Sequence, residues 1–515
     1  MTAPAVRGYY TAAEVRAAEA ELFTRVPDGM PMRRAAFGLA DLVARELRAR
    51  TGATAGRTVT LLVGSGDNGG DALWAGSFLR RRGITVTAVL LSPDRAHVQG
   101  LAALRRAGGR VIDGSAAPGS AAAQQDTQAA AVARAAAQRS ADPAVAALRA
   151  ADLVVDGIVG ISGRGALRPR AAELVAAVTA PIIAADLPSG VDTDTGAVSG
   201  AAVRAAVTVT FGAYKPVHAL AAPYCGRIEL VPIGLRLPEA NLAALEPESI
   251  GADWPVPGAA DDKYTQGVTG VCAGSAKYPG AAVLCTGGAI SATSGMVRYA
   301  GTGAAQVLAH FPEVIAADTV SATGRVQAWV FGPGAGTDAA ARERLAEILA
   351  TDLPVVVDAD GLTLLAADPS LLTGRAAPTV LTPHAGEFAR LTGADPSPDR
   401  VAAVRKLAES WNVTVLLKGR ATLVATPGRP VLVNEAGGSW AATAGSGDVL
   451  SGVIAALLAA GRDPAWAAAA AARVHALAAN LAAHAATAAG APISASPLLS
   501  HLRAAIGTLR ELAAG

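Results

Sequence analysis

The sequence predicts an α/β protein of two domains, each built on a parallel sheet that helices cover on both faces. The chain has 515 residues, which is too long for one ordinary hydrophobic core. Continuous apolar runs alternate with helical segments along it, as is typical of strands buried on both faces. Hydrophobic residues make up 51% of the chain and aromatic residues only 4%, so Ala, Val, Leu and Ile must form the cores.

The first domain is expected at residues 1–236. Its strand-like runs are separated by helices, of which the segment ALWAGSFLRRRG is a clear example. The stretch 115–150 is rich in Ala, Gln and Arg, and it indicates either a surface helical insertion or a partly disordered excursion. The strand-like runs are residues 59–63, 85–92, 153–160, 181–190, 206–216 and 227–235.

A linker is expected at residues 237–260, where prolines and acidic residues occur without a periodic pattern. The second domain is expected at residues 261–515, with its own α/β series and Gly-rich turns at strand ends. We find no internal repeat that relates the two halves. The segments of the second series are residues 269–275, 303–311, 328–334, 354–360, 378–384, 413–419 and 422–428.

Charge and composition argue against several classes of protein. The net charge is +2 without any block of like charge, so we expect no nucleic-acid partner. The N-terminus lacks the apolar core of a signal peptide, and polar residues interrupt the Ala-rich run from Ala465. We therefore expect no membrane span and a cytoplasmic location. Cys225, Cys272 and Cys285 are expected as buried thiols in a reducing compartment.

A Gly-rich turn, GSGDNGGDA at residues 64–72, connects a predicted strand to a predicted helix. The N–H groups of such a turn and the partial positive charge of a helix N-terminus suit a phosphate group. The turn is neither the dinucleotide fingerprint GxGxxG nor a Walker A loop. Taken alone, it fits an ordinary tight turn between strand and helix equally well.

Three further strand ends carry reactive side chains. VDGIVGISGRG places Asp156 at one, AADLPSGVD places Asp186 and Ser189 at another, and TFGAYKP places Lys215 at the third. Because the carboxyl ends of parallel strands meet at one edge, we expect all four turns to line one cleft. Singly, Asp156 fits a helix N-cap and Lys215 a solvated surface lysine. Their coincidence favours a site.

These four motifs, in this order, resemble the NAD(P)H-hydrate epimerase family, whose pattern reads NNGGDG, V-D-x-x-x-G-x-G, D-x-P-S-G and K-P. The resemblance covers roughly residues 10–235 and implies a Rossmann-like α/β/α domain. It implies that Asp186 and Lys215 move protons while C6 of a hydrated nicotinamide nucleotide inverts. It also implies a K⁺ ion bound by Asn68, Asp156 and Ser189. The residues it implies in hydrate binding, besides Asp186, are Asp67, Asn68, Gly69, Gly70, Asp71, Gly160, Ile161, Ser162, Gly163, Arg164, Gly165 and Ala166.

Two positions depart from that family pattern. Asp67 stands where the family usually has Asn, and Ala72 stands where it has Gly. The first departure adds negative charge close to a ligand that carries phosphates. A rival hypothesis uses Asp67 as its clue and makes the first half a nucleotide-binding or protein-binding module that has lost catalysis.

The second half contains TAGSGDVLSG, in which Asp448 precedes an apolar helix. Free N–H groups in an N-terminal helical turn suit a phosphoryl group, and an acid beside them can take the proton of an attacking hydroxyl. The alternative is a plain helix cap, which does not explain the run of small residues ahead of Asp448. In TPHAGEFARL, Glu387 fits the completion of a helix cap.

This half resembles the ADP-dependent NAD(P)H-hydrate dehydratases of the ribokinase-like superfamily, because YPGA, GPG, DAD, PHxGE, KG and GSGD recur in family order between about residues 262 and 507. The resemblance implies a ribokinase-like α/β/α domain. GGSWAATA, with Trp440 as its unusual residue, replaces the family's Gly-Asn-Pro-Gly-Met-like stretch. The implied hydrate contacts are Ala281, Gly334, His384 and Asp448, and the implied adenine-nucleotide contacts are Lys418, Gly419, Arg420, Ala421, Thr422 and Gly447.

Together the two resemblances imply a bifunctional enzyme that repairs hydrated NADH and NADPH. Its small-molecule partners would be NADHX, NADPHX and ADP. Phosphoryl transfer from ADP turns the hydrate's hydroxyl into a phosphate that can leave, with Asp448 as base and Mg²⁺ offsetting charge, and releases AMP and phosphate. A ribokinase-type sugar or hydroxymethyl-pyrimidine kinase shares GSGD but leaves YPGA, PHxGE and the first half unexplained. Helices of small residues lead us to expect a homo-oligomer.

Overall fold

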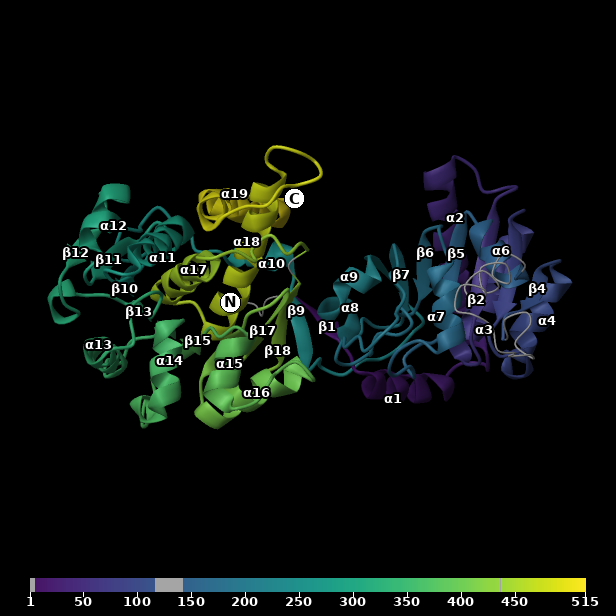
Figure 1. Cartoon of the computed structure of the whole chain (residues 1–515), viewed down its shortest axis with the longest axis horizontal. Coiled ribbons are helices and arrows are strands. Elements are labelled where there is room, and N and C mark those ends of the chain that lie inside the picture. Colours follow the sequence, from purple (N-terminus) through teal and green to yellow (C-terminus); the bar gives the residue numbers. More distant parts are fainter. Residues whose placement is uncertain (1–4, 116–141, 436) are drawn as a thin grey trace, which may run out of the picture. The chain divides into compact units, whose positions relative to one another are not determined.

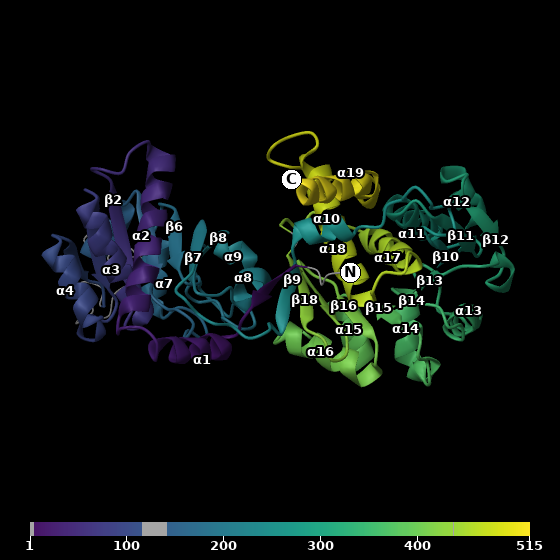
Figure 2. The same cartoon turned by 180° about the vertical axis from the view of Figure 1, so that it is seen from behind.

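The computed structural model describes residues 5–115, 142–435 and 437–515, which fold into two compact units (Figures 1 and 2). We call Gly8–Ala240 the N-terminal unit. The C-terminal unit consists of Asn241–Gly515 together with the start of the chain up to Arg7. The prediction of two α/β domains with parallel sheets is confirmed.

The N-terminal unit contains a seven-stranded parallel sheet in the order β4-β3-β2-β5-β6-β7-β8. The strand order reverses between β2 and β5, which is where open α/β sheets bind ligands outside the carboxyl ends of their strands. The strands are β2 (Thr58–Val63), β3 (Thr85–Leu90), β4 (Arg110–Asp113), β5 (Leu153–Gly157), β6 (Ile182–Ala185), β7 (Val207–Phe211) and β8 (Arg227–Val231). The helices are α1 (Ala12–Phe23), α2 (Met30–Thr51), α3 (Asp67–Arg81), η1 (Pro93–Arg95), α4 (Val98–Arg106), α6 (Pro143–Arg149), α7 (Pro169–Ala176), α8 (Pro216–Leu220) and α9 (Ala222–Cys225).

Helix α2 shows how the sequence pattern places this core. Ala36, Leu39, Val43 and Leu47 recur at helical spacing, and each is fully buried. Most of the exposed positions of the same helix hold arginine, namely Arg33, Arg34, Arg45, Arg48 and Arg50. Burying an aliphatic side chain of this kind contributes about 1.5–3 kcal/mol, so the apolar stripe fixes the side of α2 that faces the core.

The sheet of the C-terminal unit has eleven strands in the order β1-β9-β18-β17-β16-β15-β14-β13-β10-β11-β12, and the first boundary between the units falls within β1, after Arg7. The strands from β10 to β16 pair in parallel, and β17 is antiparallel to both of its neighbours. The order reverses between β10 and β13, so the turns after these strands meet at one edge. The strands are β1 (Val6–Tyr9), β9 (Leu242–Leu245), β10 (Val268–Cys272), β11 (Met296–Ala300), β12 (Ile315–Ala317), β13 (Ala328–Phe331), β14 (Val355–Val357), β15 (Thr379–Leu381), β16 (Thr414–Leu417), β17 (Ala421–Ala425) and β18 (Val431–Glu435).

The helices of the C-terminal unit follow the strands, and some of them enclose a large apolar core on one face of the sheet. Segment 303–311 of the predicted series contains a helix, α12. The helices are α10 (Pro247–Asp253), α11 (Pro279–Ala292), α12 (Ala304–His310), η2 (Ser321–Thr323), α13 (Ala339–Leu349), α14 (Asp360–Ala367), η3 (Pro369–Leu372), α15 (Ala385–Thr392), α16 (Arg400–Trp411), α17 (Ser446–Ala459), α18 (Pro464–His484) and α19 (Ala495–Ala514).

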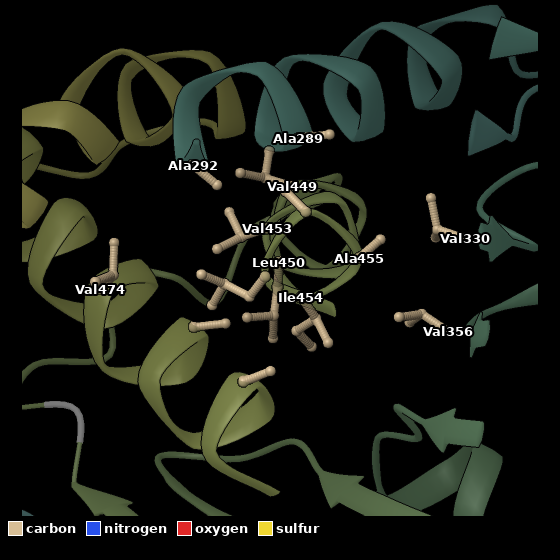
Figure 3. Close-up of a cluster of buried hydrophobic side chains, with 14 of the residues drawn as sticks. Ala289, Ala292, Val330, Val356, Val449, Leu450, Val453, Ile454, Ala455 and Val474 are labelled. Atoms are coloured by element: carbon tan, nitrogen blue, oxygen red, sulfur yellow. The ribbon is translucent and has the colours of Figure 1, made fainter. Parts of the chain in front are cut away.

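Helix α17 lies in the middle of this core, with side chains of α11, α18, β13 and β14 around it (Figure 3). Two glycines let α11 and α17 approach closely. A Cβ atom on Gly452 would lie 2.0 Å from the carbonyl oxygen of Cys285, and one on Gly288 would lie 2.3 Å from that of Val449. The small residues of both helices therefore fix the place where α17 begins, and Asp448 with it.

The structure differs from the expectation of a linker at residues 237–260. The boundary between the units falls after Ala240, and β9 and α10 belong to the C-terminal unit. Strand β9 pairs with β18, and Trp254 after α10 is 3% exposed in the core. The run LAAL is only four residues long and is flanked by acids and prolines, so it shows no periodic pattern that would have predicted a strand.

Three other expectations concern single segments. Most of the stretch 115–150 lies outside the described residues, and its end forms α6. The Ala-rich run forms α18, as predicted, and no helix of the described residues is long and apolar enough to cross a membrane. All three cysteines are buried free thiols, as predicted.

Candidate active sites

A cavity of about 830 Å³ opens at the carboxyl ends of the N-terminal unit's strands, beside the point where the strand order reverses. The four Gly-rich and acidic turns predicted from sequence converge on it. Glu19, Arg16 and the backbone of the turn after β2 complete its wall. The predicted residues that line it are Asp67, Asn68, Asp71, Gly160, Ile161, Ser162, Gly163, Arg164, Gly165, Ala166, Asp186 and Lys215.

Gly69 and Gly70 do not line this cavity, although they belong to the same motif. Both lie in the first turn of α3 and are buried. A Cβ atom on Gly69 would lie 2.3 Å from the carbonyl oxygen of Gly64, and one on Gly70 would lie 3.0 Å from His97. These two glycines therefore let the helix pack against the turn that precedes it.

A buried ion pair lies at the cavity. The Lys215 side chain is 1% exposed, and its Nζ lies 2.5 Å from Oδ1 of Asp186. The same Nζ lies 2.8 Å from the hydroxyl of Thr210 and 3.0 Å from the carbonyl oxygen of Phe211. The alternative of a solvated surface lysine is therefore wrong, because the ammonium group exchanges water for three protein oxygens.

Asp156 and Ser189 form a second buried group, which is not exposed to the cavity. The Asp156 carboxylate accepts hydrogen bonds from the hydroxyl and the N–H of Ser189 and from the N–H of Ile158. Burial raises the pKa of Asp156 to about 6, and those hydrogen bonds oppose the rise. Asp156 lies within β5, so the helix N-cap alternative is wrong.

Asn68 is the one predicted K⁺ ligand that reaches the cavity wall. It is 6% exposed, and neither its amide nitrogen nor its amide oxygen has a hydrogen-bond partner in the structure. A Cβ atom on Gly160 would lie 3.6 Å from the amide oxygen of Asn68, so the loop after β5 passes directly beside it. A buried amide without partners is costly and indicates a place for a ligand.

Carboxyl groups surround the ion pair on the cavity side. Burial raises the pKa of Asp71 well above its usual value, and the charges of Asp186, Asp67 and Glu19 add to the rise. Burial and the charge of Asp186 also raise the pKa of Glu19, which α1 contributes. Sequence reasoning missed Glu19, since the helix pattern around it carries no motif.

The two departures from the family pattern have different surroundings. Asp67 is the exposed first residue of α3, where negative charge is favourable at the helix N-terminus. Ala72 is fully buried, and a Cβ atom on Gly157 would lie 2.5 Å from its Cβ. The extra methyl group therefore packs against the end of β5 rather than filling the cavity.

In the C-terminal unit, Asp448 is the third residue of α17, and Gly445 with φ of +81° occupies the N-cap position. A plain N-cap role therefore does not account for Asp448. Burial raises the pKa of Asp448 to about 7, the charge of Asp358 adds to the rise, and Lys418 opposes it. The carboxyl group is therefore poised to exchange a proton near neutral pH.

Lys418 lies between Asp358 and the start of α17. Its Nζ is 2.6 Å from Oδ1 of Asp358, whose Oδ2 accepts a hydrogen bond of 2.7 Å from Ser451. A Cβ atom on Gly447 would lie 3.2 Å from the same Nζ. Burial alone would lower the pKa of Lys418, but the charges of Asp358 and Glu387 outweigh it and raise that pKa. Sequence reasoning did not name Asp358 as a site residue, although its DAD motif follows a buried strand.

The other predicted ligand contacts of the C-terminal unit lie in two regions, one at α11 and the turn after β13 and the other at the start of β17. Gly334, with φ of +60°, lies beside Ala281, because a Cβ atom on Gly334 would lie 2.9 Å from that of Ala281. Lys418, Gly419 and Arg420 form the turn between β16 and β17, whereas Ala421 and Thr422 lie within β17.

His384 is the N-cap of α15, and its side chain is 58% exposed. Its Nδ1 accepts hydrogen bonds from the N–H groups of Gly386 and Glu387, at 3.0 and 3.2 Å. The Glu387 carboxylate accepts one of 2.9 Å from the N–H of His384. The interpretation of Glu387 as the completion of a helix cap is therefore confirmed.

Family models match both units. The model described as NAD(P)H-hydrate dehydratase matches residues 269–500, and the model described as YjeF-related protein N-terminus matches residues 30–217. The bifunctional NAD(P)H-hydrate repair enzyme of Mycobacterium leprae is 57% identical over 507 residues, which cover 98% of this chain and 100% of that protein. The chain belongs to the bifunctional NAD(P)H-hydrate repair enzymes.

Two further relatives illustrate the range of similarity. The repair enzyme of Mycobacterium tuberculosis is 59% identical over 459 residues, covering 88% of this chain and 90% of that protein. A crystal structure of the ADP/ATP-dependent NAD(P)H-hydrate dehydratase of Bacillus subtilis, co-crystallised with ATP and Mg²⁺, is 25% identical and covers 52% of this chain and 98% of that one, with a TM-score of 0.46.

Proposed function

We propose that this repair enzyme divides its task between its two units. The N-terminal unit interconverts the R and S hydrates of NADH and NADPH, and the C-terminal unit dehydrates the S hydrate with ADP, releasing AMP and phosphate. One observation carries the proposal: a relative named a bifunctional NAD(P)H-hydrate repair enzyme matches 98% of the chain. In support, each unit places acids and a lysine together at its strand ends.

For the epimerase, the buried Asp186–Lys215 pair supports a role in proton transfer. C6 of the hydrate carries both the hydroxyl and the ring nitrogen, so it can invert if the hydroxyl gives up its proton while the C6–N bond opens to an aldehyde, a proton is supplied to the ring nitrogen, and the ring closes again on the other face. The Asp186 carboxylate would accept that proton and the Lys215 ammonium would return one, because the two groups are already hydrogen-bonded at 2.5 Å. Their burial keeps water from competing for the same proton.

The residues around Asn68 fit a potassium ion. The amide oxygen of Asn68 is buried without a partner beside Gly160, and the oxygens of Asp156 and Ser189 accept hydrogen bonds from the N–H groups of Ile158 and Val159 in the same loop. Uncharged and singly charged oxygens of this kind suit a monovalent cation. When bound, the ion would supply positive charge beside the buried Asp156 carboxylate and the anionic nucleotide.

For the dehydratase, Asp448 would take the proton of the hydrate's hydroxyl as that oxygen attacks the β-phosphoryl group of ADP. The C6–O bond then breaks with phosphate as the leaving group, assisted by the ring nitrogen, and the departing phosphate takes the proton from C5, which restores the nicotinamide double bond. Lys418 and the free N–H groups at the start of α17 would hold the phosphoryl oxygens. Mg²⁺ would offset phosphate charge in a region where Asp358, Asp360 and Glu387 already raise the pKa of Asp448.

The proposal also includes ADP as the phosphoryl donor, a homo-oligomer, a cytoplasmic location, and the predicted hydrate and nucleotide contacts. NADHX and NADPHX would be held in the N-terminal unit by Asp67 to Asp71 and the Gly160 to Ala166 loop. In the C-terminal unit the hydrate would contact Ala281, Gly334 and His384, and the nucleotide the Lys418 to Thr422 turn and Gly447.

Racemic NADHX with ADP tests both activities in one reaction. We expect the whole hydrate to be consumed with one AMP released per NADH formed. Consumption of only the S half would contradict the epimerase proposal and favour the binding-module hypothesis. No AMP release at all would contradict the dehydratase proposal.

A further inference from the structure

His218 joins the two residues of the buried ion pair through their backbones. It is 2% exposed, on α8, three residues after Lys215. Its Nδ1 accepts a hydrogen bond of 2.9 Å from the backbone N–H of Lys215. Its Nε2 lies 3.0 Å from the backbone carbonyl oxygen of Asp186. Because a carbonyl can only accept, the ring carries its proton on Nε2 and leaves Nδ1 bare.

The backbone of Asp186 is held in a conformation that needs such support. Its φ of +69° lies in the left-handed region, which residues other than glycine adopt uncommonly, although Asp does so more often than most. Conformations of this kind persist where the surrounding structure holds them on several sides. The N–H of Asp186 donates to the carbonyl oxygen of Val209 at 2.7 Å, and the bond from His218 fixes the carbonyl on the other side.

Both nitrogens of the His218 ring are occupied, so the ring itself has no free position for proton transfer to the hydrate. Burial and the positive charge of Lys215 together lower the pKa of His218 to about 4. The Tyr214 ring forms a T-shaped pair with the His218 ring, with an interplanar angle of 86° and 6.4 Å between the ring centroids. His218 is also absent from the residues that line the cavity.

We propose that His218 is a positioning residue of the epimerase, which holds the backbones of Asp186 and Lys215 so that carboxylate and ammonium meet at the cavity. The inference rests on the proposed role of that pair. A displacement of either group by about 1 Å is enough to lower a rate by about 100-fold, so loss of the histidine acts on kcat. Hydrate binding depends on the other cavity residues, so KM stays nearly constant.

Four variants separate this role from a general loss of packing. His218→Leu removes both hydrogen bonds. His218→Asn keeps an acceptor near the N–H of Lys215, and His218→Gln keeps a donor that reaches the carbonyl of Asp186. Thr208→Val is the matched control. Thr208 lies near the amino end of β7, is equally buried, and donates a hydrogen bond to the carbonyl oxygen of Cys225.

Epimerisation is followed on the full chain as conversion of pure R hydrate to the R and S mixture without ADP, so that dehydration cannot contribute. Dehydration is measured on the same preparation with S hydrate and ADP. We expect His218→Leu to lower the epimerase kcat by about 10- to 100-fold with KM changed less than about threefold. His218→Asn and His218→Gln should each recover part of that loss, while Thr208→Val keeps the kcat and dehydration stays unchanged in all four.

Two results overturn the inference while leaving the proposed function intact. An unchanged epimerase kcat in His218→Leu would show that the pair needs no such support. An equal loss in Thr208→Val would show that any lost buried hydrogen bond in this sheet has the same effect. The proposed function fails differently, since the unsubstituted chain would then not epimerise the R hydrate at all.

Discussion

Each unit combines an acid with a lysine, which is fully buried in the N-terminal unit and half-buried in the C-terminal unit, and the lysine has a different partner in the two. In the N-terminal unit Lys215 contacts the proposed catalytic acid itself, at 2.5 Å from Asp186. In the C-terminal unit Lys418 pairs instead with Asp358, and Asp448 is left beside them with its pKa raised to about 7. The contact between Lys215 and Asp186 suits proton transfer in both directions. In the C-terminal unit Asp448 stays available as a base, while Lys418 is available to bind phosphate.

The largest effect is expected for Asp448→Asn, which tests whether the two activities belong to two different sites. We expect dehydration of the S hydrate to fall by about 100- to 10,000-fold, because the hydroxyl loses the group that accepts its proton. Conversion of R to S hydrate should stay at the unsubstituted rate. The variant should melt no lower at pH 8, because the raised pKa means that ionised Asp448 destabilises the folded state above its unfolded pKa. Retained dehydration would return Asp448 to a structural role.

Asp186→Asn is the reciprocal experiment on the N-terminal unit. We expect epimerisation to fall by about 100-fold or more, with dehydration of pure S hydrate unaffected. Because Lys215 then stays buried without its partner, the unit should lose about 3–5 kcal/mol of unfolding free energy. Chemical unfolding with a signal from this unit measures the loss. Equal stability of the variant would mean that the pair is not as buried as the structure places it.

The third prediction concerns the ion pair of Lys418 with Asp358. Since Asp448 must be ionised to act as base, kcat/KM for dehydration should rise with pH and level off above about 7. Asp358→Asn removes a negative charge that raises this pKa and frees Lys418 to act on Asp448. The rise of kcat/KM for dehydration should therefore move to lower pH, whereas epimerisation should keep its pH profile. A rise that still levels off near pH 7 would mean that a group other than Asp448 causes it.

The four turns that line the N-terminal cavity were predicted from sequence because strand ends are marked locally. Each turn follows an apolar run, and a parallel sheet brings the carboxyl ends of its strands to one edge. Asp67, Asp156, Asp186 and Lys215 were named in this way. Asp448 was named in the same way, because glycines mark the turn before it.

The rest of both sites depends on contacts between distant segments, which leave no local pattern. Glu19 reaches the cavity from α1, and Asp358 is defined as a site residue only by its bonds to Lys418 and Ser451. His218 looks like an ordinary helix residue until its two backbone partners are seen. Strand β9 was missed because two leucines and two alanines carry too little apolar area to stand out.

The smallest expected effect concerns the proposed K⁺ site, which has no counterpart in our proposal for the C-terminal unit. Titration with KCl, at constant ionic strength kept with choline chloride, should raise the melting temperature by a few degrees, about 1–3 kcal/mol at saturating ion. Asn68→Ala should remove most of this rise, because it deletes the buried amide oxygen that has no partner in the protein. Asn434→Ala serves as the control, since that amide already donates to the carbonyl oxygen of Ala472. If both variants keep the rise, the ion binds elsewhere. If only Asn68→Ala loses it, the orphaned amide of α3 is the ligand that draws the ion to the N-terminal unit.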